Sequence, residues 1–253
     1  MRNRLSWVPE RAVTFRFWRA CGTIRRERII LGMNPFFAHW ATRISGLVAV
    51  AAALLFGSTA LRPLSADDPK GNWTSLFDGQ TLKGWKSTEF GGEGAVEVKD
   101  GVILLGVGND LTGVNYQRPV PHRNYEVSLE ARRVDGSDFF CGLTFPVKDD
   151  PCSLIIGGWG GGVCGLSSID GLDASENSTT KYREFQTGRW YTIRLRVTDA
   201  KIEAWIDKDQ IVDQKLAGKK ISIRSEVEAS RPFGIASYRT LAALRNIWLR
   251  ELK

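Results

Sequence analysis

The densest group of chemically versatile side chains follows a glycine-rich run in the second half of the chain. That run, Gly157–Gly162, contains Trp159, whose flat apolar face could stack on a sugar ring. Three carboxylates follow at short spacing, Asp170, Asp173 and Glu176. Such a group could supply a base and an acid for proton transfer, or it could ligate a divalent cation such as calcium.

The same segment carries polar groups that could bind a ligand without taking part in proton transfer. Asn177 and Lys181 could donate hydrogen bonds to sugar hydroxyls. The spacing of the carboxylates is not that of an EF-hand loop. A solvated loop held by Asx turns would have the same composition, so an active-site loop and an ordinary surface loop are both open interpretations.

A lone histidine is a further candidate for proton transfer. His122 stands in the sequence Pro121-His122-Arg123 and is the only histidine after the first 66 residues. A single histidine cannot build a histidine-rich metal site. His122 could serve as a base or be an ordinary loop residue.

A predicted hairpin over residues 190–207 supplies the third group of candidates. Its strands alternate apolar and polar residues around a two-residue turn, which places Arg196 opposite Glu203 and Arg194 opposite Trp205. These pairs predict an ion pair and a cation–π contact on a solvated face. Alternatively, Arg194, Glu203 and Trp205 could line a sugar-binding groove.

Three cysteines follow the first 66 residues. Cys141 and Cys152 flank a proline- and aspartate-containing loop, which predicts a disulfide across a hairpin end. Cys164 lies in an apolar, glycine-rich segment and is expected to be a small buried residue. No Cys-x-x-Cys or cysteine–histidine spacing indicates a zinc site.

The elements that must position these residues are short strands. Residues 125–132 alternate apolar and polar side chains, which predicts a strand with one buried and one wet face. Residues 95–98 and 102–105 flank an Asp-Gly turn of the hairpin type. No amphipathic helix of three turns is evident after residue 70, so the pattern favours an all-β sandwich or barrel.

The basic charge of the chain is concentrated at its beginning. The net charge is +7, but residues 1–66 hold 10 lysines and arginines against two acidic residues. Residues 67–253 hold 25 basic and 26 acidic residues and are nearly neutral. This balance argues against a nucleic-acid partner for the folded part.

Residues 1–66 have the layout of an export leader. The apolar run 44–56 follows arginines and precedes small residues, with predicted cleavage after Ala60 or Ala66. Met33 would give a leader of ordinary length and is the expected true start. An uncleaved membrane anchor is the alternative, and either interpretation predicts a single domain over residues 67–253 in the periplasm or outside the cell.

Four segments of the chain resemble one protein family. Residues 73–85, Trp-Thr-Ser-Leu-Phe-Asp-Gly-Gln-Thr-Leu-Lys-Gly-Trp, resemble the opening strand and turn of the 3-keto-disaccharide hydrolases, also described as 3-keto-glucoside lyases and hydratases. Residues 96–103, 188–190 and 244–252 are similar to its next hairpin, its Gly-x-Trp motif and its closing strand. The resemblance implies a two-sheet antiparallel jelly-roll sandwich of the concanavalin A-like lectin and glucanase type.

The resemblance also implies a chemistry. A ketone at C3 of a sugar acidifies the C2 hydrogen, so that a base can remove it and the C1 aglycone can leave. Such a site needs a base near C2, an acid near the leaving oxygen, and a donor or divalent cation at the ketone.

The chain departs from the family at several polar positions. Phe140-Cys141-Gly142 stands where the family usually has Asn-Ser-Gly, and an arginine that often follows is replaced near Pro146. Ser153 and Ile155 correspond to a glutamate and a glutamine of the family, and Tyr191 to an asparagine. The sequence therefore predicts a carbohydrate partner and either a 3-keto-glycoside hydrolase or lyase, or a non-catalytic carbohydrate-binding module on the same fold. A structural or envelope-interaction domain is a third interpretation.

Overall fold

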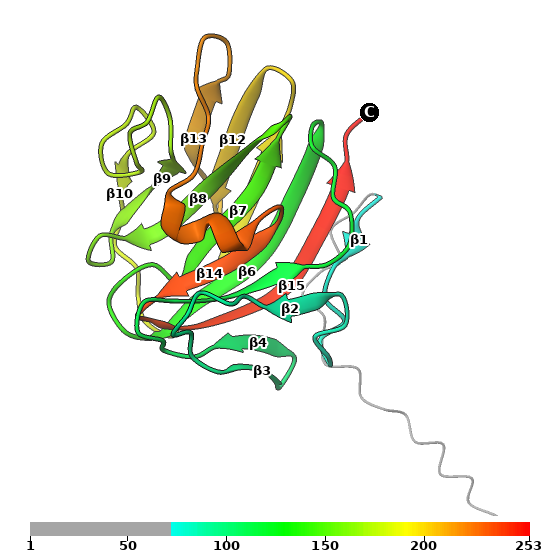
Figure 1. Ribbon diagram of the computed structural model, residues 1–253, viewed down its shortest axis with the longest axis vertical. Helices are drawn as coiled ribbons and strands as arrows, with labels where there is room; N and C mark the ends of the chain where they lie inside the picture. The colour runs from blue at the N-terminus through cyan, green and yellow to red at the C-terminus, as the bar shows by residue number, and fades with distance from the viewer. Residues whose placement is uncertain (1–71) are drawn as a thin grey trace, which may run out of the picture. The chain divides into compact units, whose positions relative to one another are not determined.

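The computed structural model describes residues 72–253, which form two antiparallel β-sheets (Figure 1). The strands of the first sheet, called sheet 1, are β1 (Thr74–Ser75), β3 (Val96–Lys99), β4 (Val102–Leu105), β6 (Tyr125–Asp135), β11 (Tyr191–Val197), β12 (Lys201–Ile206), β13 (Asp209–Lys215) and β15 (Leu241–Glu251). The strands of the second, called sheet 2, are β2 (Trp85–Ser87), β5 (Leu111–Tyr116), β7 (Cys141–Val147), β8 (Asp150–Gly158), β9 (Val163–Ser167), β10 (Lys181–Tyr182) and β14 (Gly234–Tyr238). A short 3₁₀ helix, η1 (Ser225–Ser230), precedes β14.

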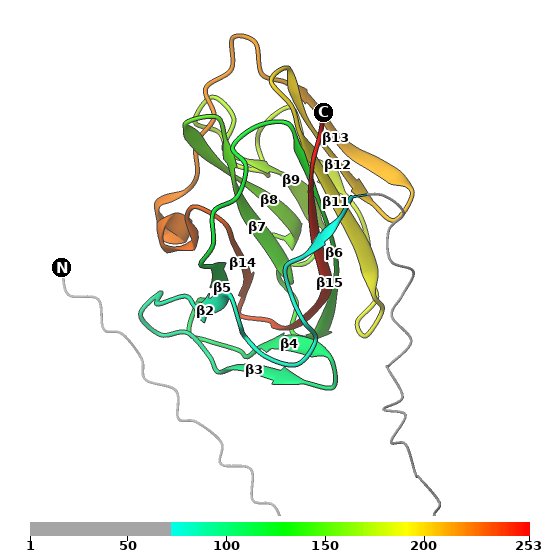
Figure 2. The same ribbon diagram turned by 90° about the vertical axis from the view of Figure 1, so that its right-hand side faces the viewer.

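The order of the strands interleaves distant parts of the chain. Sheet 1 runs β13-β12-β11-β6-β15-β4-β3, with β1 beside β15, and sheet 2 runs β10-β9-β8-β7-β14-β5-β2. Figure 2 shows the two sheets edge-on as two layers, with η1 on the outer side of sheet 2. The all-β, two-sheet antiparallel jelly-roll sandwich implied by the sequence is confirmed.

Two hairpins expected from the sequence form, and the second has the predicted register. In the first, Lys99 pairs with Val102 around Asp100-Gly101, which both have positive φ, 51° and 80°. A two-residue turn of this kind matches the twist of its strands, and glycine adopts the second position without strain. In the second, Arg196 pairs with Glu203 and Arg194 with Trp205.

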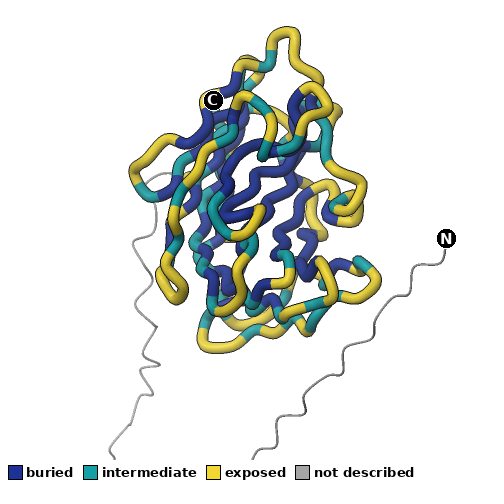
Figure 3. Tube along the Cα trace, turned by 90° about the vertical axis from the view of Figure 1, so that its left-hand side faces the viewer, coloured by how far each residue is buried: buried dark blue, intermediate teal, exposed yellow. Residues whose placement is uncertain are grey.

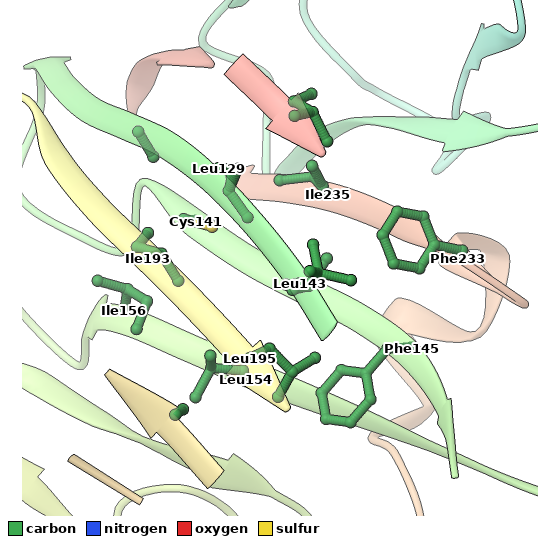
Figure 4. Close-up of a cluster of buried hydrophobic side chains, with 14 of the residues drawn as sticks. Leu129, Cys141, Leu143, Phe145, Leu154, Ile156, Ile193, Leu195, Phe233 and Ile235 are labelled. Carbon is green, nitrogen blue, oxygen red and sulfur yellow. The ribbon is translucent and has the colours of Figure 1, made fainter. Parts of the chain in front are cut away.

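The core fills the space between the sheets. Figure 4 shows Leu129, Ile193 and Leu195 of sheet 1 gathered with Leu143 and Ile156 of sheet 2 in one cluster, all almost fully buried. In Figure 3 the buried residues follow the strands through the middle of the domain, and exposed residues occupy the loops. Each strand therefore gives alternate residues to the core, and the residues between them face outward.

The predicted disulfide between Cys141 and Cys152 is wrong, because the two residues are not opposite one another. In the β7–β8 register Cys141 pairs with Ile156, whereas Cys152 pairs with Phe145. Four residues of strand therefore separate the two thiols along the hairpin, too far for a disulfide. Both thiols and that of Cys164 are free and buried, and burial raises the pKa of Cys141 and Cys152 to about 12.

The leader predicted over residues 1–66, with its expected start at Met33, lies outside the described residues. Within residues 72–253 no helix is long and apolar enough to cross a membrane.

Candidate functional site

The outer face of sheet 2 is built from small and hydroxyl-bearing residues. The core takes alternate residues of each strand, which leaves two rows facing outward. Residues of the first row stand opposite one another on β9, β8, β7, β14 and β5: Ser167, Ser153, Thr144, Gly234 and Asn115. Residues of the second row follow in the same strand order: Gly165, Ile155, Gly142, Ala236 and Gly113. Because these side chains are short, they leave room above the sheet.

A cavity of about 600 Å³ occupies part of that room. Ser153, Ile155 and Ser167 form its floor. Its volume falls in the range typical of sites for small ligands.

One wall of the cavity is η1, which the outward residues of sheet 2 hold in place. Asn115 Nδ2 donates to the carbonyl oxygens of Ala229, at 2.8 Å, and Arg231, at 3.0 Å. At Gly234 a Cβ atom would lie only 2.6 Å from Ser230 O, so the close approach of the helix requires glycine there. Figures 1 and 2 show η1 lying over β14.

The polar segment singled out in the sequence, here called the 168–180 loop, lies beside the cavity floor and contributes no residue to the lining of the cavity. Asn177 organises it: Nδ2 donates to the carbonyl oxygens of Leu166 and Asp173, and Oδ1 accepts from Thr179 N–H. Ala174 packs with Ile155 on the sheet. Asn177 therefore shapes the loop through its own hydrogen bonds and does not line the cavity.

Arg224 joins the 168–180 loop to η1. Its Nη1 lies 2.8 Å from Asp173 Oδ2 of the loop, and its Nη2 lies 2.6 Å from Glu226 Oε1 of η1. The hydrogen bond to Glu226 is the main cause of a raised pKa at Arg224, and Arg224 in turn lowers the pKa of Glu226. Arg224 and Glu226 line the cavity, so a predicted acid, Asp173, reaches it only through the guanidinium.

The other predicted acids and bases do not come together at the cavity. Asp170 is exposed and accepts from Lys219 Nζ at 2.7 Å and from Lys220 N–H at 3.0 Å, and these hydrogen bonds lower its pKa. Glu176 is also exposed, and neither Asp170 nor Glu176 lines the cavity. His122 is likewise exposed, with Nδ1 2.9 Å from Lys148 O near the β7–β8 turn. The predicted ligand residue Lys181 is exposed on the edge strand β10.

Arg194, Glu203 and Trp205 lie on the outer face of sheet 1, and none of them lines the cavity. The guanidinium of Arg194 covers the Trp205 ring at 3.9 Å, so that ring face is occupied. Glu203 is mostly buried and its Oε1 lies 2.7 Å from Lys201 Nζ. The alternative of a solvated face with an ion pair and a cation–π contact is the one observed.

Trp159 is the one predicted ligand residue that lines the cavity, and it is 44% exposed at the rim. The sequence interpretation missed two other aromatic residues that line the cavity, Phe139 and Tyr238, whose rings stack on each other with centroids 5.9 Å apart. It also missed Asp110 and Asp138, which line the same rim. The family resemblance could have located the site, because it singled out Ser153 and Ile155, which form the floor of the cavity.

The carboxylates of the cavity do not form a metal-binding set. Asp110 pairs with Arg239 at 2.7 Å, and Glu226 pairs with Arg224. Asp138 accepts from the backbone N–H groups of Phe139 and Gly160. No group of three or more His, Cys, Asp or Glu residues within 72–253 is arranged to hold a metal ion, so the divalent cation considered from the sequence has no matching ligands there.

The domain is thus an all-β sandwich whose candidate ligand site is the cavity on the outer face of sheet 2. The family model of the 3-keto-alpha-glucoside-1,2-lyase-like domain matches residues 72–250. The chain therefore belongs to this family, and membership supports a carbohydrate-active function. A search of curated proteins finds no match.

Several solved structures are similar to this chain at low identity. One is described as a candidate glycosyl hydrolase of Parabacteroides distasonis, with 14% identity, TM-score 0.46, and coverage of 72% of this chain and 94% of that one. Another is a protein of unknown function with a galectin-like fold from Bacillus subtilis, with 10% identity, TM-score 0.45, and coverage of 67% and 90%. A third is a carbohydrate-binding module from Bacillus subtilis, with 9% identity, TM-score 0.40, and coverage of 65% and 93%.

Proposed function

We propose that this domain cleaves 3-keto-glycosides in the cavity over sheet 2, by removing the C2 proton and eliminating the C1 aglycone. The observation that carries the proposal is the position of the cavity. Its floor holds Ser153 and Ile155, two of the positions at which the family resemblance places polar residues. The aromatic rim of Trp159, Phe139 and Tyr238 suits the apolar face of a sugar ring.

The elimination balances without an oxidant or reductant. The base takes the C2 proton, a double bond forms between C1 and C2, and the C1–O bond breaks. The aglycone leaves with a proton as an alcohol, and water then adds to the unsaturated 3-keto sugar.

Asp138 is the best-placed base. None of the ion pairs of the described residues involves it, whereas Asp110 and Glu226 each pair with an arginine. Its carboxylate is held at the rim by two backbone N–H groups, 2.7 and 3.0 Å away. Arg224 is the cation that lines the cavity and is the proposed donor to the oxygen at C3, where negative charge develops.

A non-catalytic carbohydrate-binding module is the second candidate. The observation that favours it is the chemistry of the floor, where Ser153 and Ile155 replace the family's glutamate and glutamine. The same cavity would then bind a sugar without reacting with it.

One experiment separates the two functions. The purified protein is incubated with matched aryl glucosides and their 3-keto derivatives, and aglycone release is followed. Release from the keto substrates alone, abolished in Asp138→Asn and kept in the control Asp170→Asn, is the result expected for the lyase. Sugar binding by calorimetry with no release from either substrate would sink the lyase and favour the binding module.

Export is a further part of the proposal and rests on the apolar run at residues 44–56 behind its arginines. N-terminal sequencing of the native protein is expected to find a start after Ala60 or Ala66. A native product that still begins at Met33 or earlier would favour the membrane anchor if it is membrane-bound, and would contradict export if it is in the cytoplasm.

A further inference from the structure

Ser167 presents an unpaired hydroxyl to the cavity. The residue is 2% exposed and lines the cavity floor, yet its Oγ has no hydrogen-bond partner. Only one other buried side-chain atom among residues 72–253 is in this condition, Arg132 Nε, which lies on sheet 1. A buried hydroxyl without a partner is costly, so its position at a ligand site calls for an explanation.

The neighbouring hydroxyls are satisfied by each other. Ser153 stands opposite Ser167 on the sheet, and Thr144 stands opposite Ser153. Thr144 Oγ1 and Ser153 Oγ lie 2.8 Å apart and are both almost fully buried. Ser167 is thus the unpaired end of a row of three hydroxyls on the outer face of sheet 2, and this end of the row lies at the cavity floor.

The charges around the cavity favour a neutral ligand. Asp110, Asp138 and Glu226 line it, and Arg224 already contacts two carboxylates. The floor itself holds no ionisable group: it is formed by Ser153, Ile155 and Ser167. A ligand carboxylate on this floor would be desolvated and would lie among like charges, which disfavours it.

We propose that Ser167 Oγ is the specificity-determining contact of the cavity and hydrogen-bonds a neutral oxygen of the bound sugar, so that the site selects uncharged pyranoses over uronic acids. The inference rests on the proposed carbohydrate function of the same cavity. It concerns recognition alone and holds for either a lyase or a binding module. A hydroxyl is suited to this role because it can donate to a ketone or accept from a sugar hydroxyl.

The test combines ligand affinity with thermal stability. Calorimetry of the full chain with a 3-keto-glucoside, its parent glucoside and the matching glucuronide measures affinity for wild type, Ser167→Ala and the near-isosteric Ser167→Cys. We expect the wild type to bind one of the uncharged sugars, and both variants to bind it about 3- to 10-fold more weakly, the range of one lost hydrogen bond. The glucuronide should bind the wild type at least about 10-fold more weakly than the uncharged sugar, because a charge is desolvated.

Thermal unfolding separates a ligand-binding hydroxyl from a purely structural one. Removing a structural hydroxyl would lower the melting temperature. Ser167→Ala should leave the melting temperature unchanged or raise it, because it removes an unpaired group. The control Ser153→Ala should lower it, because it leaves Thr144 unpaired.

Each remaining outcome is decisive. Unchanged sugar affinity in both Ser167 variants, a clear loss of melting temperature in Ser167→Ala, or equal affinity for glucuronide and glucoside would overturn the inference while leaving the carbohydrate function standing. A wild-type protein that binds none of the three sugars would overturn the proposed function and the inference with it.

Discussion

The outer faces of the two sheets both cover the sandwich core, but sheet 1 carries long side chains and the centre of sheet 2 carries short ones. On sheet 1 the long side chains contact one another: Glu126 is fully buried, with Arg196 Nε at 3.0 Å and Arg250 Nε at 2.6 Å. On sheet 2 the central outward residues, Ile155 apart, are glycine, alanine, serine and threonine, whose short side chains reach no further than the next strand. Long, mutually paired side chains close a sheet face, whereas short ones leave space that distant loops convert into a cavity.

The tryptophans of sheet 1 show how completely that face is occupied. The Trp190 ring lies between the guanidinium groups of Arg132 and Arg245, at 4.6 and 4.1 Å. Trp73 is covered by Arg250 at 4.6 Å. These rings are stabilised by cation–π contacts and have little free face for a sugar, unlike Trp159 at the rim of the cavity.

The sharpest test of this contrast is to remove the buried carboxylate of sheet 1. Glu126→Ala should cost about 3 kcal/mol of unfolding free energy, because it leaves arginines without their buried partner. Urea unfolding measures the change, and Glu97→Ala, an exposed glutamate on β3 of the same sheet, is the control. A loss below about 1 kcal/mol, the value of a surface ion pair, would contradict the description of a closed, mutually dependent face.

Replacing one tryptophan on each face tests which of them binds sugar. Trp159→Ala should weaken binding of the 3-keto-glucoside about 5- to 10-fold, equivalent to about 1–1.4 kcal/mol of stacking. Trp205→Ala should leave the affinity unchanged and instead lower the melting temperature. Calorimetry measures the sugar affinity of both variants. A loss of affinity in Trp205→Ala alone would place the binding site on sheet 1 instead of in the cavity.

A smaller effect is expected where η1, a wall of the cavity, meets the 168–180 loop. Arg224→Gln breaks the link between the 168–180 loop and η1, and should weaken sugar binding about 3-fold, as for loss of a partly exposed charged hydrogen bond. Arg231→Gln is the matched control, since Arg231 also pairs with a glutamate of η1, Glu228, and does not line the cavity. Equal affinity losses in the two variants would show that the link between the 168–180 loop and η1 does not matter for sugar binding.

The smallest effect concerns Asp170, whose pKa is lowered by Lys219 and by the Lys220 N–H. A carboxyl group whose pKa is lowered in the folded state stabilises the protein at pH values above its ordinary pKa of 3.8. This stabilisation is lost as the pH falls through the folded-state pKa. Asp170→Asn should therefore change the melting temperature little at neutral pH and flatten its decline between about pH 5 and pH 3. Calorimetric scans of both proteins compare the two slopes. Identical slopes would argue against this ion pair in solution.

The local elements could be predicted because their signals are local. Alternation over residues 125–132 fixed which side of β6 faces the core, and the Asp-Gly turn set the β3–β4 register. The pairs Arg196–Glu203 and Arg194–Trp205 followed from one turn position. The disulfide prediction failed because a loop between two cysteines says nothing about their register, which placed Cys141 and Cys152 four residues apart along the hairpin.

The site was only partly predictable, because its groups come from separate strands and loops. The sequence by itself determined the strand pattern, the all-β class and the family resemblance, since each depends on neighbouring residues or on short motifs in order. Only the tertiary structure decided that Asp138, Trp159, Arg224 and Tyr238 surround one cavity, and that Asp170 and His122 lie outside it. The physical reason is that a cavity is the space left by small side chains, such as those of Ser153 and Ser167, and what surrounds that space depends on how distant loops pack over the sheet.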